Sequence, residues 1–208
     1  MTRLGSRATG GRRWTALLGA ACVVVAACSS PGHGQPLTTV PTASTTTTTP
    51  LGQVPAVIDI PYVQRVMDVL DHLTGEATRR FVAQRGPDTE FEADLSGIYG
   101  PPALDSVKAT YGRYAAQPEL GGLRSSPGDP VASIHRLVGS SNRCIVFSGA
   151  LDLGPILKNP PPPGSTEGVF QLGPKTTGQD PSHFNPTPWV ILAEGPPAAG
   201  TLPEKPCT

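Results

Sequence analysis

The stretch of sequence that decides the fold reads DIPYVQRVMDVLDHLTGEATRRFVAQ and covers residues 59–84. Apolar side chains recur in it at steps of three and four residues, which is the spacing of one face of an amphipathic helix. These residues are Val63, Val66, Met67, Leu70, Leu73, Ala77 and Phe81. Asp59 suits the N-cap and Pro61 the first turn. We therefore predict a helix over 59–84, with Gly75 as a weak point that can divide it.

Two shorter helices are expected after this one. Gly86-Pro87-Asp88 contains strong helix-breaking residues and ends the first helix. A second helix is predicted over 90–99, and Gly100-Pro101-Pro102 separates it from a third, which begins at Leu104 and ends before Pro118.

The pattern changes to strands after residue 130. Segments 131–138 and 143–153 are rich in strand-forming residues, and Ser140-Ser141-Asn142 between them is typical of a turn. Two further strands are predicted over 167–172 and 189–194, with a long loop between them. Helices followed by hairpin-connected strands predict an α+β domain, with N-terminal helices packed on a curved antiparallel sheet of about four strands.

This order of elements over residues 59–195 resembles the NTF2-like (cystatin-like) superfamily. The ending Asn185-Pro186-Thr187-Pro188-Trp189-Val190-Ile191 also looks like a final strand of such exported domains. The resemblance implies a long first helix lying in a cone-shaped sheet. It also implies that an enzyme of this type would place an Asp and a His or Tyr inside the cone to move a proton.

The start of the chain has the features of a secretory leader. Residues 1–13 contain four arginines and no acid, and residues 14–27 are almost wholly apolar. This apolar run of 14 residues is shorter than the roughly 20 that span a bilayer as a helix, which disfavours a permanent transmembrane helix. Arg12-Arg13 leaves twin-arginine export open as an alternative to the general route.

Val25-Ala26-Ala27-Cys28 resembles the lipobox of bacterial lipoproteins of the high-GC Gram-positive type. The resemblance implies cleavage before Cys28, lipidation of its sulfur, and anchorage on the extracytoplasmic face of the cell membrane. Cys22 also follows small residues, Ala20 and Ala21, but it lies inside the apolar run and is interpreted as a passive apolar residue.

The predicted organisation is a signal peptide over 1–27, a lipidated cysteine with a disordered tether over 28–55, and a single α+β domain over 56–208. Residues 29–55 are rich in Thr, Pro, Ser and Gly and contain no charged residue, so they cannot bury enough apolar surface to order themselves. Both an O-glycosylated stalk and an unmodified spacer fit this composition.

The charge balance disfavours nucleic acid as a partner. The whole chain has a formal net charge of zero. Loss of the four leader arginines leaves 12 basic residues against 16 acidic ones, a net charge of −4. Binding to phosphates requires a basic surface, and we therefore expect no nucleic-acid partner.

Cys144 and Cys207 remain beyond the anchor. In an exported chain an even pair of cysteines predicts a disulfide. A bridge closing this loop of about 63 residues would stabilise the fold by about 4 kcal/mol on chain-entropy grounds. Free thiols and a metal site are the disfavoured alternatives, because no other metal-ligating residues cluster around either cysteine.

Five residues are candidates for proton transfer: Asp68, Asp71, His72, Tyr99 and His135. The two aspartates lie largely off the apolar stripe and are interpreted as solvated helix charges. His72 borders the stripe, and His135 alternates with Ile134, which places it on the side away from the helices. We therefore predict no catalytic residue among them.

The segment Asp180-Pro181-Ser182-His183 is a candidate metal site, but no second histidine stands at a ligand spacing. No nucleophile elbow, phosphate-binding loop or dinucleotide-binding fingerprint occurs in the sequence. We therefore expect no metal and no cofactor.

Three functions fit these observations. The first is a lipid-anchored accessory or binding domain of the cell envelope, without catalytic activity, that docks on another envelope protein. The second is a carrier of a small ligand or lipid, with an apolar pocket between the helix over 59–84 and the sheet. The third is an NTF2-like isomerase or dehydratase. Whether the chain is an enzyme stays open, although the absence of a catalytic motif favours a binding protein.

Overall fold

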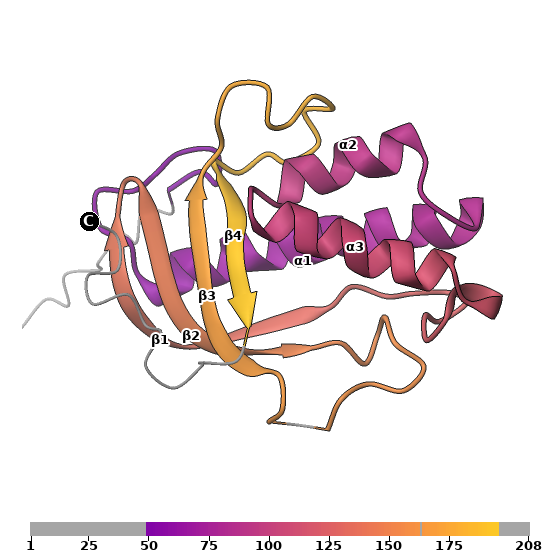
Figure 1. Cartoon of the computed structure of the whole chain (residues 1–208). Helices are drawn as coiled ribbons and strands as arrows, with labels where there is room; N and C mark the ends of the chain where they lie inside the picture. Colours follow the sequence, from indigo (N-terminus) through magenta and orange to yellow (C-terminus); the bar gives the residue numbers. More distant parts are fainter. Residues whose placement is uncertain (1–48, 163, 196–208) are drawn as a thin grey trace, which may run out of the picture. The chain divides into compact units, whose positions relative to one another are not determined.

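The computed structural model describes residues 49–162 and 164–195 (Figure 1). The predicted signal peptide, Cys28, most of the predicted tether and Cys207 lie outside the described residues. Within those two ranges, no helix combines the length and apolarity needed to cross a membrane.

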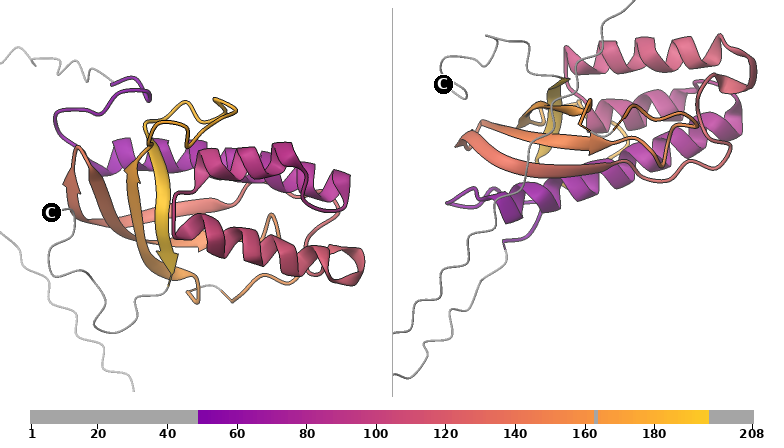
Figure 2. Two further views of the ribbon diagram at one scale, coloured as in Figure 1. Left: turned by 45° about the horizontal axis from the view of Figure 1, so that its top comes forward. Right: turned by 90° about the horizontal axis from the view of Figure 1, so that it is seen from below.

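Helices and one antiparallel sheet make up the described chain, so the predicted α+β class is confirmed. The helices are α1 (Ile60–Gln84), α2 (Thr89–Ile98) and α3 (Ala103–Ala115), followed by a short 3-10 turn at Pro118–Leu120. The strands are β1 (Val131–Ser141), β2 (Cys144–Asp152), β3 (Glu167–Pro174) and β4 (Trp189–Gly195). They pair in the order β1-β2-β3-β4. Figure 2 (right) shows strand ends reaching into the space between α1 and α3.

The capping residues of α1 explain its limits. Asp59 Oδ1 accepts the Tyr62 backbone N–H at 2.9 Å, as an N-cap should. Arg85 takes a left-handed conformation with φ 57° and ends the helix. The whole predicted apolar stripe is buried.

Gly75 does not divide α1, because the helix runs through that residue without interruption. Gly75 has a packing role instead. A Cβ placed there would lie 2.9 Å from Asp129 Cα and would overlap the Asp129 carboxylate. The missing side chain therefore lets the segment before β1 pack directly on α1.

The turn between β1 and β2 is shorter than the sequence predicted. β1 and β2 stay paired as far as Ser141 and Cys144, so Ser140 and Ser141 belong to the strand and the turn is Asn142-Arg143. The Ser141 Oγ still serves the turn, since it accepts the Arg143 backbone N–H at 3.2 Å. Two register shifts interrupt β1, and bulges of this kind bend a strand. The curvature is visible in Figure 1.

The outer edge of β1 is covered by side chains of α1. Gln64 Nε2 donates to the Ala132 carbonyl at 2.8 Å, and Gln64 Oε1 accepts the Ile134 N–H at 3.2 Å. Asp71 Oδ2 accepts the Ala132 N–H at 2.6 Å. These three hydrogen bonds satisfy backbone groups that an edge strand otherwise leaves open to other chains.

The few aromatic residues lie at the centre of the core. Phe147 and Phe170 stack across β2 and β3, with ring centroids 5.1 Å apart. Phe81, Phe91 and Tyr111 form a second group that joins the three helices, with centroid distances of 4.9–5.1 Å. Large rings packed in this way contribute more than their buried area alone, which compensates for their small number.

The contact between Gly75 and Asp129 gives a first testable prediction. Replacing a helical glycine with alanine normally stabilises a protein by about 0.5–1 kcal/mol. We expect Gly75→Ala to destabilise this chain by about 1–3 kcal/mol instead, because the new methyl group forces Asp129 away from α1. Chemical denaturation of the full chain measures the difference.

Gly112→Ala is the matched control. Gly112 also lies inside a helix, α3, but a Cβ placed at this residue would have open space around it, with no neighbouring atom within 4 Å. This change is therefore expected to stabilise the chain by the usual amount. Equal effects of the two substitutions would contradict the packing role of Gly75.

Candidate functional site

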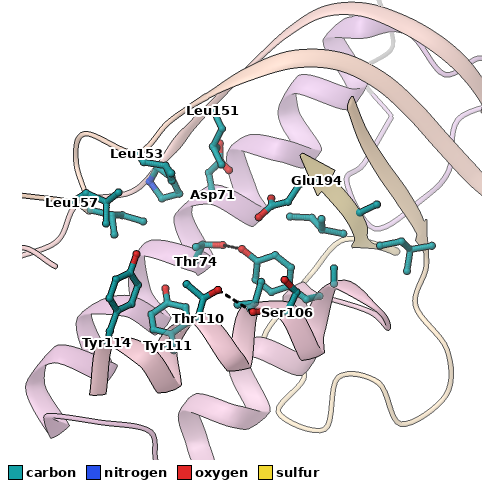
Figure 3. A pocket seen from close by; sticks show the side chains of 18 of the residues that line it. Asp71, Thr74, Ser106, Thr110, Tyr111, Tyr114, Leu151, Leu153, Leu157 and Glu194 are labelled. Carbon is teal, nitrogen blue, oxygen red and sulfur yellow. Dashed lines mark hydrogen bonds between the residues drawn. The ribbon is translucent and has the colours of Figure 1, made fainter. Parts of the chain in front are cut away.

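A cavity of about 460 Å³ lies between α1, α3, β4 and the segment that follows β2 (Figure 3). Most of its wall is aliphatic. The aliphatic side chains include Leu151, Leu153, Ile156, Leu157, Ile191 and Leu192. The helix–sheet interior is therefore hollow at this point and not filled by side chains.

Asp71 of α1 lines this cavity and is only 6% exposed. Of the two aspartates interpreted as solvated, Asp68 is indeed exposed, whereas the interpretation of Asp71 is wrong. Asp71 stands four residues after the buried Met67, which places it at the margin of the apolar stripe, and that spacing was the available signal. Its place in the interior follows from its hydrogen bond to the Ala132 N–H.

The environment of Asp71 favours the protonated carboxyl group. Burial raises its pKa to about 7; the hydrogen bond from Ala132 opposes the rise, and the negative charges of Asp68, Glu194 and Asp129 add to it. A carboxyl group with such a pKa exchanges its proton near neutral pH.

Glu194 of β4 is the second acid in the cavity wall. Its side chain is solvent-accessible, yet it lies in a concave wall, and desolvation by the surrounding protein raises its pKa. Glu194 is not among the candidates that the sequence pattern indicates. The indication in the sequence was weak: Glu194 is the only charged residue of β4, which is otherwise apolar.

Hydroxyl groups of tyrosines and threonines form another part of the wall. Tyr99, one of the sequence candidates, is buried, and its hydroxyl lies 3.4 Å from Thr74 Oγ1. The Tyr111 hydroxyl is 2.5 Å from Thr78 Oγ1. Burial raises the pKa of Tyr99 well above its usual value and that of Tyr111 to about 12, so both stay neutral. Tyr114 completes the aromatic part of the wall.

The two histidine candidates lie away from the cavity lining. His72 is exposed, and its Nδ1 lies 2.9 Å from Asp129 Oδ2. Arg79 Nη1 donates to the other oxygen of Asp129 at 2.8 Å. Burial alone would raise the pKa of Asp129, but the bonds from His72 and Arg79 outweigh it and lower the pKa. His135 is exposed on β1, as its alternation predicted.

Asp180 organises the loop between β3 and β4. Its carboxylate accepts the backbone N–H groups of Phe184 and Asn185, each at 3.0 Å, and Lys175 Nζ lies 3.3 Å away. Desolvation would raise its pKa, but these bonds together lower it. No group of three or more metal-ligating side chains occurs in the part of the chain that the structure describes. Asp180 therefore holds the loop through these hydrogen bonds.

Cys144, at the start of β2, is disulfide-bonded. Its predicted partner, Cys207, lies outside the described residues, so the pairing of these two cysteines stays a prediction.

Comparison with known proteins gave no match: no family model, no curated protein and no solved structure is significantly similar to the chain.

Asp71 makes the stability of the protein depend on pH. The folded chain holds a proton on Asp71 up to about pH 7, whereas the unfolded chain releases it near the ordinary value of 3.8. The contribution of this residue to stability therefore falls as pH rises between those two values and is constant above them. In Asp71→Asn the amide oxygen still accepts the Ala132 N–H, but the side chain no longer titrates. The substitution therefore removes the pH-dependent loss of stability, which in the wild type is at most about 4 kcal/mol.

Chemical denaturation at about pH 5 and about pH 8 measures this prediction. Relative to wild type, Asp71→Asn should gain stability at the higher pH. Asp68→Asn, which removes an exposed acid one turn away, should retain most of the wild-type dependence. An Asp71→Asn chain with the wild-type pH dependence would show that Asp71 titrates normally in the folded state.

Proposed function

We propose that this protein is a lipid-anchored, extracytoplasmic binding domain that takes up a small, largely apolar molecule in the cavity between α1, α3 and β4. The observation that carries the proposal is the cavity of about 460 Å³ with its aliphatic wall. Its volume falls within the roughly 300–1,000 Å³ of small-molecule sites, which are similarly lined by apolar and aromatic side chains with a few polar groups.

The NTF2-like arrangement is part of this proposal. It is supported by the long α1, which runs beside a curved antiparallel sheet (Figure 1), and by the three hydrogen bonds that join α1 to the edge of β1. In a cone of this kind the ligand would enter between the helices and the open end of the sheet.

The extracytoplasmic location rests on the sequence. The basic and apolar leader, the lipobox ending at Cys28 and the uncharged tether together support export followed by lipid anchorage. An envelope protein that receives the ligand from this domain is the partner that a carrier of this kind would serve.

Proton-transfer catalysis, as in an NTF2-like isomerase or dehydratase, is the second candidate. Asp71, with a pKa of about 7 beside an apolar cavity, favours it, because such a carboxyl group can act as a base near neutral pH. Catalysis would also require a proton donor facing the substrate. The buried hydroxyls of Tyr99 and Tyr111 instead face Thr74 and Thr78, and we therefore rank binding first.

The cavity can be tested by filling it. Thr110 of α3 lines the cavity, and Thr110→Phe would place a ring in the space where the ligand lies. Native mass spectrometry of the full chain, extracted from its own host, should show additional small-molecule mass on the wild type and little or none on Thr110→Phe.

Ala109→Phe is the matched control. Ala109 is the neighbouring residue of α3, is exposed, and is not part of the cavity lining, so this variant should keep the additional mass. A wild-type chain that carries no additional mass under these conditions would refute the proposed function.

The anchor gives a separate prediction. Cys28→Ala removes the sulfur that would be acylated, and we expect the chain to move from the membrane fraction to the soluble fraction or to keep its leader uncleaved. Cys22→Ala, six residues earlier, should leave the chain acylated and in the membrane. Intact mass and fractionation distinguish the variants, and an acylated Cys28→Ala chain would contradict the lipobox interpretation.

A further inference from the structure

We propose that the cavity selects a cationic amphiphile, that is, an apolar molecule with one ammonium head group, which the carboxyl groups of Asp71 and Glu194 recognise. This inference rests on the proposed binding function and names the class of its ligand. It depends on the charge of the cavity wall, on the position of the two acids, and on the apolar side chains that lie beside them.

Among its described residues, the wall of the cavity has acidic side chains but no basic side chains to balance their charge. Asp71 and Glu194 both line it, and among the described residues that line it there is no Lys, Arg or His. Where these acids are ionised, an anionic ligand such as a fatty acid would meet like charges without a counterion, and such juxtaposition is strongly unfavourable. A cationic head group supplies the missing charge.

Asp71 presents an acceptor that the fold leaves unused. Its Oδ2 accepts the Ala132 N–H, whereas its Oδ1 has no hydrogen-bond partner within the part of the chain that the structure describes. The residue is 6% exposed and lines the cavity. This second oxygen is therefore available to a ligand in the cavity, and an ammonium group there can donate a hydrogen bond to it.

Asp71 and Glu194 come from different elements but meet at the cavity. Figure 3 shows the carboxylate of Glu194, from β4, near Asp71 of α1, and the charge of Glu194 contributes to the raised pKa of Asp71. An ammonium group has three donors, enough to bind both carboxylates at once.

The part of the cavity away from Glu194 is suited to an apolar tail. In Figure 3, Leu157 and Tyr114 lie at the far side of the cavity from Glu194, with Leu153 beside them. Leu157 and Tyr114 are partly buried against the core. An apolar surface therefore lies beside the two acids, where the tail of an amphiphile would pack.

Binding of an ammonium group should be linked to a proton. The titratable or charged groups around Asp71 are Asp68 on α1, Glu194 on β4, Asp129 before β1 and the Tyr99 hydroxyl, with His72 and Arg79 both bonded to Asp129. Since the pKa of Asp71 is about 7, the ligand would bind the ionised fraction. Its apparent affinity should rise by up to about tenfold from about pH 6 to about pH 8.

The test uses three compounds that share one apolar body: phenylbutylamine, phenylbutanol and phenylbutyrate. Each is titrated calorimetrically into the full, acylated chain held in lipid nanodiscs, with empty nanodiscs as the blank. We expect the amine to bind at least about tenfold more tightly than the alcohol, because hydrogen bonds to charged groups are the stronger ones. The carboxylate should bind most weakly of the three.

Two variants assign the preference to the named residues. Glu194→Gln and Asp71→Asn should each reduce the advantage of the amine over the alcohol at least severalfold while alcohol binding is retained. Retained alcohol binding also shows that the variant is folded. Asp105→Asn removes an exposed acid of α3 outside the cavity lining and should leave the advantage unchanged.

The outcomes separate this inference from the function on which it rests. If the alcohol binds as tightly as the amine, or the carboxylate binds most tightly, the selectivity is wrong while the binding function stands. An amine advantage that survives both Glu194→Gln and Asp71→Asn would likewise overturn the assignment. If none of the three compounds binds the wild type more tightly than it binds Thr110→Phe, both the inference and the proposed function fail.

Discussion

The hydrogen bonds that attach α1 to the edge of β1 are the constraint on which the rest of the structure depends. A sheet edge exposes backbone groups that must be paired or covered, and here Gln64 and Asp71 supply the partners for Ala132 and Ile134. Because these bonds are made by side chains seven residues apart on one helix, they fix the direction of α1 along the strand. The apolar stripe of α1 is thereby held against the sheet.

The cavity is a consequence of how the other helices are placed. α1 is bound to β1 at one edge of the sheet, whereas α3 packs beside β4 at the other edge, and few of its side chains are buried. The aromatic cluster around Tyr111 holds α3 to α1 and α2 at one end. Between these attachments Ser106, Val107 and Thr110 of α3 line the cavity, and the space between α3 and α1 stays open to a ligand.

The sequence predicted what depends on local periodicity and not what depends on contacts between distant residues. The apolar stripe of α1, the four strands and the exposure of His135 follow from repeats of 3.6 or 2 residues. The burial of Asp71 depends on a hydrogen bond across 61 residues, and the role of Gly75 on a contact with Asp129. Neither Ala132 nor Asp129 can be identified as a partner from the stretch 59–84 alone. Glu194 becomes a candidate site residue only once β4 is known to line the same cavity as α1.

The carboxyl group of Asp71 indicates that the cavity has a function besides its place in the fold. An asparagine at this position would accept the Ala132 N–H equally well and would not bring a titratable charge into the interior, which is costly. The fold alone therefore gives no reason for a carboxyl group whose pKa is raised to about 7. Functional sites are where such costs are tolerated. A carboxyl group with one oxygen bound to the backbone and the other beside an apolar cavity has a position fixed by the fold and an acceptor left for a ligand.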